Sequence, residues 1–438
     1  MPLLSNIIPK THFYFNSLIA LLPVSFILGN SAINLNIILI VISSLLRFKK
    51  DLFKIKLLLL DKLFFLFFFL IIFTGIYNDI YFIIKDAYPE DYQTTKKSFL
   101  YLRYLLFYFS VRFLVERKII DLKFFFISCL LSSLFVTFDI IYQLIVGKDI
   151  FGYAIINSRK LSGPFGDELI AGGYLLRFSI FSIFLVPLFY KKIPARLLYF
   201  IIPFLVCTFI AGIILSGNRM PLIMYVFTLL LIIIFQKQTR KYLIVFMATS
   251  LIVFSITYKF NLKVKNNFDN FYYQISKMVE LIYTKDFYNE KAPDHLKEFA
   301  SFYNTWKMNK YIGGGIKNFW YYCAVEQTLR KNSLTVCNTH PHNYYLEIIT
   351  ETGLLGLIVF LAILIQILLI TFYKKYFTNS SLQNNNVLIP FIFLFLCEIF
   401  PLKSTGSIFT TNNATYLFLL ISILIGISNQ EKLIENKK

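Results

Sequence analysis

The chain has 438 residues, of which 57% are hydrophobic and 16% are charged, and its formal net charge is +20 at pH 7. Soluble domains carry about 25% charged residues, so this composition excludes an ordinary soluble domain and predicts a polytopic membrane protein. The surplus of Lys and Arg lies in short connections between apolar segments, which favours an orientation signal for the membrane over nucleic-acid binding.

Apolar segments of about the length of a membrane span recur along the whole chain. A spanning helix needs about 20 mostly apolar residues. The expected spans are residues 13–28, 32–46, 63–77, 98–115, 124–146, 169–190, 197–215, 221–235, 242–260, 353–372, 387–400 and 414–427. We therefore expect an all-α, polytopic membrane helical bundle of about 12 transmembrane helices.

Basic residues gather in every second connection between these spans, and the chain ends in two lysines. Short loops rich in Lys and Arg mark the cytoplasmic side, so we expect both termini in the cytoplasm. The long polar segment then lies on the outer side, because long segments cross regardless of charge. We expect three parts: 1–260 with about nine spans, 261–344 as the outer loop with the active-site segment, and 345–438 with about three spans.

The outer loop carries signs of a folded cap. Residues 294–308, DHLKEFASFYNTWKM, place apolar side chains at helical spacing, and the three glycines at 313–315 break that pattern. We expect a helical cap. Cys323 and Cys337 both fall in this loop, where an oxidising compartment favours a disulfide; the alternative is two free thiols.

Two of the chain's four histidines, His340 and His342, are separated by a single residue. His342 and Asn343 are followed by nine residues, Gly353, two residues and Gly356. This pattern, H-[N/S/Q]-x9-G-x-x-G, resembles the signature of the O-antigen ligase and polysaccharide polymerase superfamily. Residues 159–175, 216–223 and 310–319 also resemble segments of that family.

The resemblance implies a membrane glycosyltransferase in the bacterial inner membrane with a periplasmic active site and no cofactor. Its donor would be a glycan on polyprenyl (undecaprenyl) diphosphate, and its acceptor a sugar hydroxyl. Histidine titrates near neutral pH and suits a general base, so we expect His342 to be that base. Arginine stays protonated and binds phosphate oxygens, so we expect Arg219 to hold the leaving diphosphate.

The outer loops hold no cluster of Asp, Glu and His at the spacing of divalent-metal ligands. We therefore expect metal-independent transfer, in which arginine takes the place of the metal that other sugar transferases use. The resemblance implies the same, with inversion at the sugar carbon.

Further polar residues are candidates for substrate binding: Arg159, Asn343, His340, Arg177, Arg103 and Arg330. Arg103 and Arg177 lie inside expected spans, where charge is costly and usually functional; the alternative is an ion pair with Asp139 or Glu398, or with lipid phosphate.

Most candidates also have a structural alternative. His342 or Asn343 could cap the following helix, and His340 could only orient the loop. Arg219 could be an interfacial anchor. Gly353 and Gly356 favour close helix packing over chemistry.

Three functions stay open at this point. The first is an O-antigen ligase that moves a glycan onto a lipid A-core sugar. The second is a polymerase that joins lipid-linked repeat units, or a protein O-oligosaccharyltransferase, since the motif concerns shared donor chemistry. The third is a transporter or lipid flippase, which an internal repeat would favour. In every case we expect membrane lipids around the chain and no nucleic-acid partner.

Overall fold

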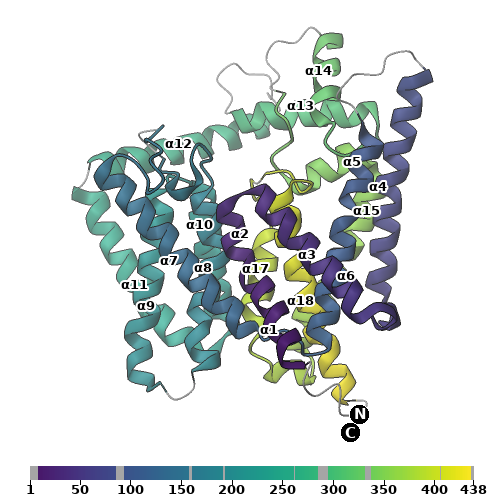
Figure 1. Cartoon of the computed structure of the whole chain (residues 1–438). Helices are drawn as coiled ribbons and strands as arrows, with labels where there is room; N and C mark the ends of the chain where they lie inside the picture. Colours follow the sequence, from purple (N-terminus) through teal and green to yellow (C-terminus); the bar gives the residue numbers. More distant parts are fainter. Residues whose placement is uncertain are drawn as a thin grey trace.

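The computed structural model describes residues 8–84, 93–156, 160–190, 193–260, 262–284, 294–330, 337–404 and 406–435. Within these residues the regular structure is helical, apart from one isolated bridge between Lys148 and Ala154. Apolar helices pack side by side into a bundle, and three helices, α12, α13 and α14, lie at one end of it (Figure 1). The fold is the all-α polytopic bundle that the composition predicts.

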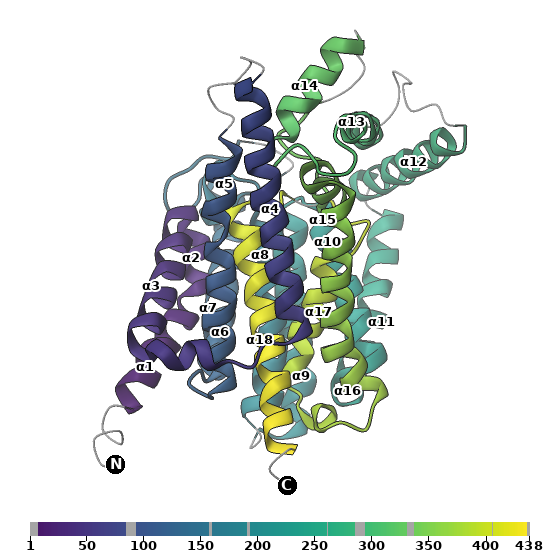
Figure 2. The same cartoon turned by 90° about the vertical axis from the view of Figure 1, so that its right-hand side faces the viewer.

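The helices of the bundle are α1 (Ile8–Ala20), α2 (Leu22–Leu28), α3 (Asn30–Phe48), α4 (Leu59–Ile84), α5 (Thr94–Tyr101), α6 (Arg103–Glu116), α7 (Leu122–Val146), α8 (Ala171–Phe189), α9 (Ala195–Leu215), α10 (Arg219–Phe235), α11 (Lys237–Phe260), α15 (Tyr344–Leu368), α16 (Lys374–Phe377), α17 (Leu388–Glu398) and α18 (Thr411–Glu435). The cap consists of α12 (Leu262–Thr284), α13 (Asp294–Met308) and α14 (Phe319–Arg330). The start of α1 and the end of α18, the first and last described parts of the chain, lie at the opposite end of the bundle (Figure 2). We call the two ends the cap end and the terminal end.

By length and composition, eight helices of the described residues can cross a membrane, or nine if the pair α1 and α2 is one span. α10 and α17 are shorter apolar helices. The expected count of 12 stays a prediction. The expected span 13–28 is not one straight helix, because α1 and α2 meet at an angle of 41°. Pro23 lies in the first turn of α2, where its missing N–H costs no helix bond.

Aromatic residues and one close helix contact form much of the core. The rings of Phe68, Tyr101 and Tyr104 all lie within 6.4 Å of other aromatic centroids in a group around Phe418 of α18. α18 packs along α6, and a Cβ atom on Gly426 would come within 2.7 Å of the Val115 side chain. A small residue at this point lets the two backbones approach.

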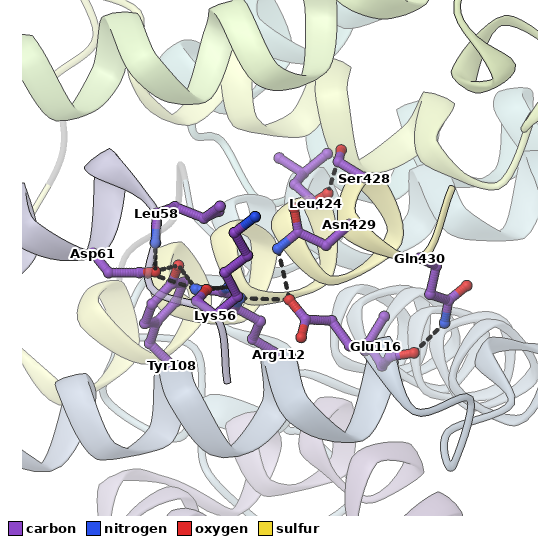
Figure 3. A network of polar contacts seen from close by, with 11 residues as sticks. Lys56, Leu58, Asp61, Tyr108, Arg112, Glu116, Leu424, Ser428, Asn429 and Gln430 are labelled. Carbon is purple, nitrogen blue, oxygen red and sulfur yellow. Dashed lines mark hydrogen bonds and ion pairs between the residues drawn. The ribbon is translucent and has the colours of Figure 1, made fainter. Parts of the chain in front are cut away.

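A buried group of charged residues fastens the terminal end (Figure 3). Arg112 of α6 donates to Asp61 of α4 at 2.6 Å and to Glu116 at 2.7 Å. Glu116 also accepts from Asn429 of α18 at 2.7 Å, and Tyr108 donates to Asp61 at 2.8 Å. We call these five residues the terminal-end cluster, and they connect α4, α6 and α18.

The cap contains the helix that the sequence predicts for 294–308, because α13 spans Asp294–Met308. Phe302 of α13 packs against Phe319 and Cys323 of α14. A disulfide joins Cys323 to Cys337. The cap is therefore tied covalently to the segment that leads into α15.

Candidate active site

The histidine motif lies at the beginning of α15, and Asn343 caps this helix. Its side-chain oxygen accepts from the backbone N–H groups of Tyr345 at 3.0 Å and Leu346 at 3.2 Å. Its amide nitrogen donates to the carbonyls of Pro401 at 2.7 Å and Lys403 at 3.4 Å. Asparagine is a favoured N-cap residue, so Asn343 takes the structural role that the sequence left open, and it also fixes the connection between α17 and α18.

His342 lies in a strained turn. Its backbone φ angle is +45°. Residues other than glycine rarely adopt such a value, and it often marks functional sites. The preceding Pro341 is buried. The rings of His340 and His342 lie edge to face with centroids 4.4 Å apart, so the turn brings the two histidines of the motif together.

His340 is held as a neutral ring. Its Nδ1 lies 2.9 Å from Oγ1 of Thr339, and its buried Nε2 has no partner among the described residues. Burial lowers the pKa of His340 to about 4, and the neighbouring His342 acts in the same direction. At neutral pH the pair therefore gains no charge from His340.

Three attachments hold the histidine segment, residues 337–343. The disulfide fastens Cys337 to α14, and Asn338 donates a hydrogen bond to Glu298 of α13. At the other end, Asn343 is bonded to the carbonyls of the connection between α17 and α18. The position of His342 thus depends on both the cap and the bundle.

Gly353 interrupts α15 at a point where a loop of the cap packs against it. This loop, residues 309–318 between α13 and α14, is called the glycine loop. The φ of Gly353 is +71°, and a Cβ there would lie 2.0 Å from the carbonyl oxygen of Tyr311. Next to it, Leu354 donates to the carbonyl of Lys310 at 2.9 Å, and Gly314 donates to that of Thr350 at 2.9 Å. The close neighbour of Gly353 is therefore a loop backbone, and not a second helix as the sequence favoured.

Gly356 has a different neighbour. A Cβ there would lie 1.9 Å from the hydroxyl of Thr352 in its own helix. The second glycine of the motif therefore makes room for a side chain one turn earlier.

A second polar group lies where α8, α15, α17 and α18 meet. Nη2 of Arg177 donates to Glu398 and to Asn413, both at 2.6 Å. Glu398 also accepts from the hydroxyl of Tyr344 and from Nζ of Lys403, both at 2.6 Å. We call these five residues the cap-end cluster. The ion pair with Glu398 is the alternative that the sequence offered for Arg177.

Arg103 pairs with neither Asp139 nor Glu398 in the contacts of the described residues. Its Nη2 donates to the hydroxyls of Tyr104 at 2.9 Å and Thr411 at 3.5 Å. Lys317 of the glycine loop lies close enough for electrostatic repulsion: burial first, and then the charge of Arg103, lower the pKa of Lys317.

Arg219 is the first residue of α10. Its Nη1 donates to the side-chain oxygen of Gln274 of α12 at 3.3 Å, so it links the bundle to the cap. Two other candidates lie outside the described residues: all of Arg159, and the side chain of Arg330 at the end of α14.

Sequence reasoning did not name Lys403 as a site residue, and it considered Glu398 only as a partner. Lys403 lies five residues after Glu398, in a short connection between two apolar segments. The signal available in the sequence was a glutamate and a lysine close together at the end of an apolar segment, where charge is costly. Among the described residues, no three or more His, Cys, Asp or Glu side chains are grouped so that they could hold a metal ion.

Residues 203–361 match the family model described as O-Antigen ligase. The match includes Arg219, the whole cap and the histidine motif up to Gly356. No curated protein matches the chain. The apolar helices and this family together indicate a multi-pass bacterial membrane protein. The match over residues 203–361 supports the resemblance to the O-antigen ligase and polymerase superfamily, whose members are membrane glycosyltransferases.

Proposed function

We propose that the protein is an O-antigen ligase-like glycosyltransferase. It moves a glycan from a polyprenyl diphosphate carrier onto a sugar hydroxyl of the lipid A core, at the periplasmic face of the inner membrane. The observation that carries this proposal is His342, held in a positive-φ turn at the start of α15 inside the matched segment. A polymerase of the same superfamily is the alternative.

His342 acts as the general base. It accepts the proton of the acceptor hydroxyl while that oxygen attacks the sugar carbon that carries the diphosphate. The bond between this carbon and the diphosphate oxygen breaks, and the leaving diphosphate gains negative charge. Arg219 stabilises that charge. The three attachments of residues 337–343 keep the base in place, and accurate placement of a catalytic group lowers the activation barrier.

The cap end faces the periplasm in this proposal. The basic loops favour a cytoplasmic position for both termini, and the start of α1 and the end of α18 lie at the end opposite the cap (Figure 2). Residues 1–260 and 345–438 then form the membrane parts, and 261–344 form the periplasmic part. Arg103 and His340 are further candidates for contact with the donor or the acceptor.

Glycan transfer by the purified protein in nanodiscs tests this function. The reaction contains glycan on polyprenyl diphosphate, lipid A core and EDTA. We expect His342→Ala to lower transfer by about 10²–10⁴-fold, the usual contribution of a general base. Arg219→Ala should lower it by about 10²–10³-fold, as loss of one charge-stabilising group does.

A melting curve for each variant separates lost chemistry from lost folding. Longer lipid-linked glycan without modified core would identify a polymerase. Unchanged transfer in both folded variants would show that these residues are not the active site.

A further inference from the structure

The cap-end cluster holds more positive than negative charge. Arg177 and Lys403 share a single carboxylate, Glu398, and no other carboxylate of the described residues bonds to either cation. The three side chains are only 14%, 7% and 2% exposed, in the order Arg177, Lys403, Glu398. Both oxygens of Glu398 are already occupied, so the surplus positive charge has no internal counter-ion there.

The two cations also keep unused donors. A guanidinium has five N–H donors and an ammonium has three. Arg177 uses only Nη2, and its Nε and Nη1 have no acceptor among the described residues. Lys403 uses its ammonium for Glu398 alone. A mostly buried cation with unused donors is unfavourable unless an anion completes it.

The cluster is connected to the histidine segment by two bonds. The hydroxyl of Tyr344, two residues after His342, donates to Glu398 at 2.6 Å. The amide of Asn343 donates to the carbonyl of Lys403 at 3.4 Å. The surplus charge therefore lies next to the turn that carries the proposed base.

We propose that Arg177 and Lys403 form a binding subsite for a phosphate group, and that this group belongs to the diphosphate of the lipid-linked donor. Glu398 is a positioning residue that holds the two cations side by side through its two oxygens. In this proposal the diphosphate contacts Arg177 and Lys403 in addition to Arg219, the residue that the proposed function assigns to it. The identity of the donor rests on the proposed function, whereas the phosphate chemistry follows from the cluster alone.

Binding of inorganic pyrophosphate to the full-length protein tests the subsite without any glycan transfer. The protein is placed in nanodiscs of phosphatidylcholine, and the dissociation constant is measured by calorimetry. We expect Arg177→Gln and Lys403→Met each to raise the dissociation constant at least tenfold. Lys375→Met is the matched control, because Lys375 is an equally buried lysine that binds three backbone carbonyls in another part of the bundle.

Two outcomes would overturn the proposal. Equal pyrophosphate binding by wild type and by the folded Arg177 and Lys403 variants would show that the cluster does not bind phosphate. If phosphatidylglycerol in the nanodisc displaces pyrophosphate fully at a few lipids per protein, the site recognises a phospholipid headgroup and not the donor. If farnesyl diphosphate binds more tightly than pyrophosphate even when phosphatidylglycerol is present, the result supports recognition of the diphosphate of a lipid-linked donor.

The same measurement distinguishes this proposal from the proposed function. His342→Ala should keep the pyrophosphate affinity of the wild type, because His342 is assigned to the acceptor hydroxyl. Phosphate binding that depends on Lys403 would stand even if no glycan were transferred to lipid A core.

Discussion

The two ends of the bundle each contain a buried ion cluster, and the two clusters have opposite charge ratios. At the terminal end one arginine, Arg112, lies between two carboxylates, Asp61 and Glu116 (Figure 3). At the cap end two cations share one carboxylate. Residues of the same chemical types therefore form one cluster that is complete within the protein and one that still has donors to offer.

The use of the donors of the two arginines shows the difference most clearly. All three nitrogens of Arg112 have acceptors: Nε bonds to Glu116, Nη1 to Asp61 and Nη2 to the carbonyl of Lys56. Arg177 bonds through Nη2 alone. A saturated arginine that joins helices indicates packing, whereas a held but unsaturated one indicates binding.

The comparison makes Arg112→Met the more damaging of two matched substitutions. It leaves Asp61 and Glu116 without their cation, and breaking a buried ion pair in this way costs about 3–5 kcal/mol. Arg177→Met leaves Glu398 with Lys403 and Tyr344, so the loss of stability should be smaller. Unfolding of both variants in detergent, followed by circular dichroism, measures the difference. Equal losses would remove the distinction between a structural and a binding cluster.

Gly353→Ala tests the backbone contact at the cap end. Gly353 has φ +71° and ψ −175°, a conformation that is essentially confined to glycine and costs other residues about 1–3 kcal/mol, and overlap with the carbonyl of Tyr311 adds about 1–3 kcal/mol. We expect faster amide hydrogen exchange at Gly314 and Gly315 and reduced glycan transfer.

Gly29→Ala is the control for that substitution. Gly29 has φ +96° and ψ −176°, close to the values of Gly353, but open space around its Cβ position, so this variant bears the conformational cost alone. Equal effects of the two alanine substitutions would show that the packing of residues 309–318 against Gly353 contributes nothing to the stability of the cap end.

Local patterns in the sequence predict the all-helical fold class, the helix α13 and one part of the site. The apolar periodicity predicts the bundle, and the spacing of residues 294–308 predicts α13 as it is observed. An asparagine before an apolar run is a local signal as well, and Asn343 caps α15.

The cap-end cluster could not be predicted in the same way. Arg177 and Glu398 are 221 residues apart in the chain, and no spacing rule connects them. The break at Gly353 likewise depends on a loop about 40 residues earlier in the sequence. Both depend on how distant segments pack.

The smallest expected effect concerns the pH dependence of stability at the cap end. The pKa of His340 is about 4 in the folded protein, below its ordinary value of 6.5. Between these two values the unfolded chain binds more protons than the folded one, so stability rises with pH. The contribution of His340 is complete above about pH 6.5 and is lost as the pH falls towards 4. His340→Gln should therefore reduce the fall in melting temperature between pH 7 and pH 5, while Arg112, which stays protonated, contributes nothing to it. An unchanged pH dependence in the variant would mean that His340 is not held neutral by its surroundings, and the histidine turn would then be more open to water than the packing of the two rings implies.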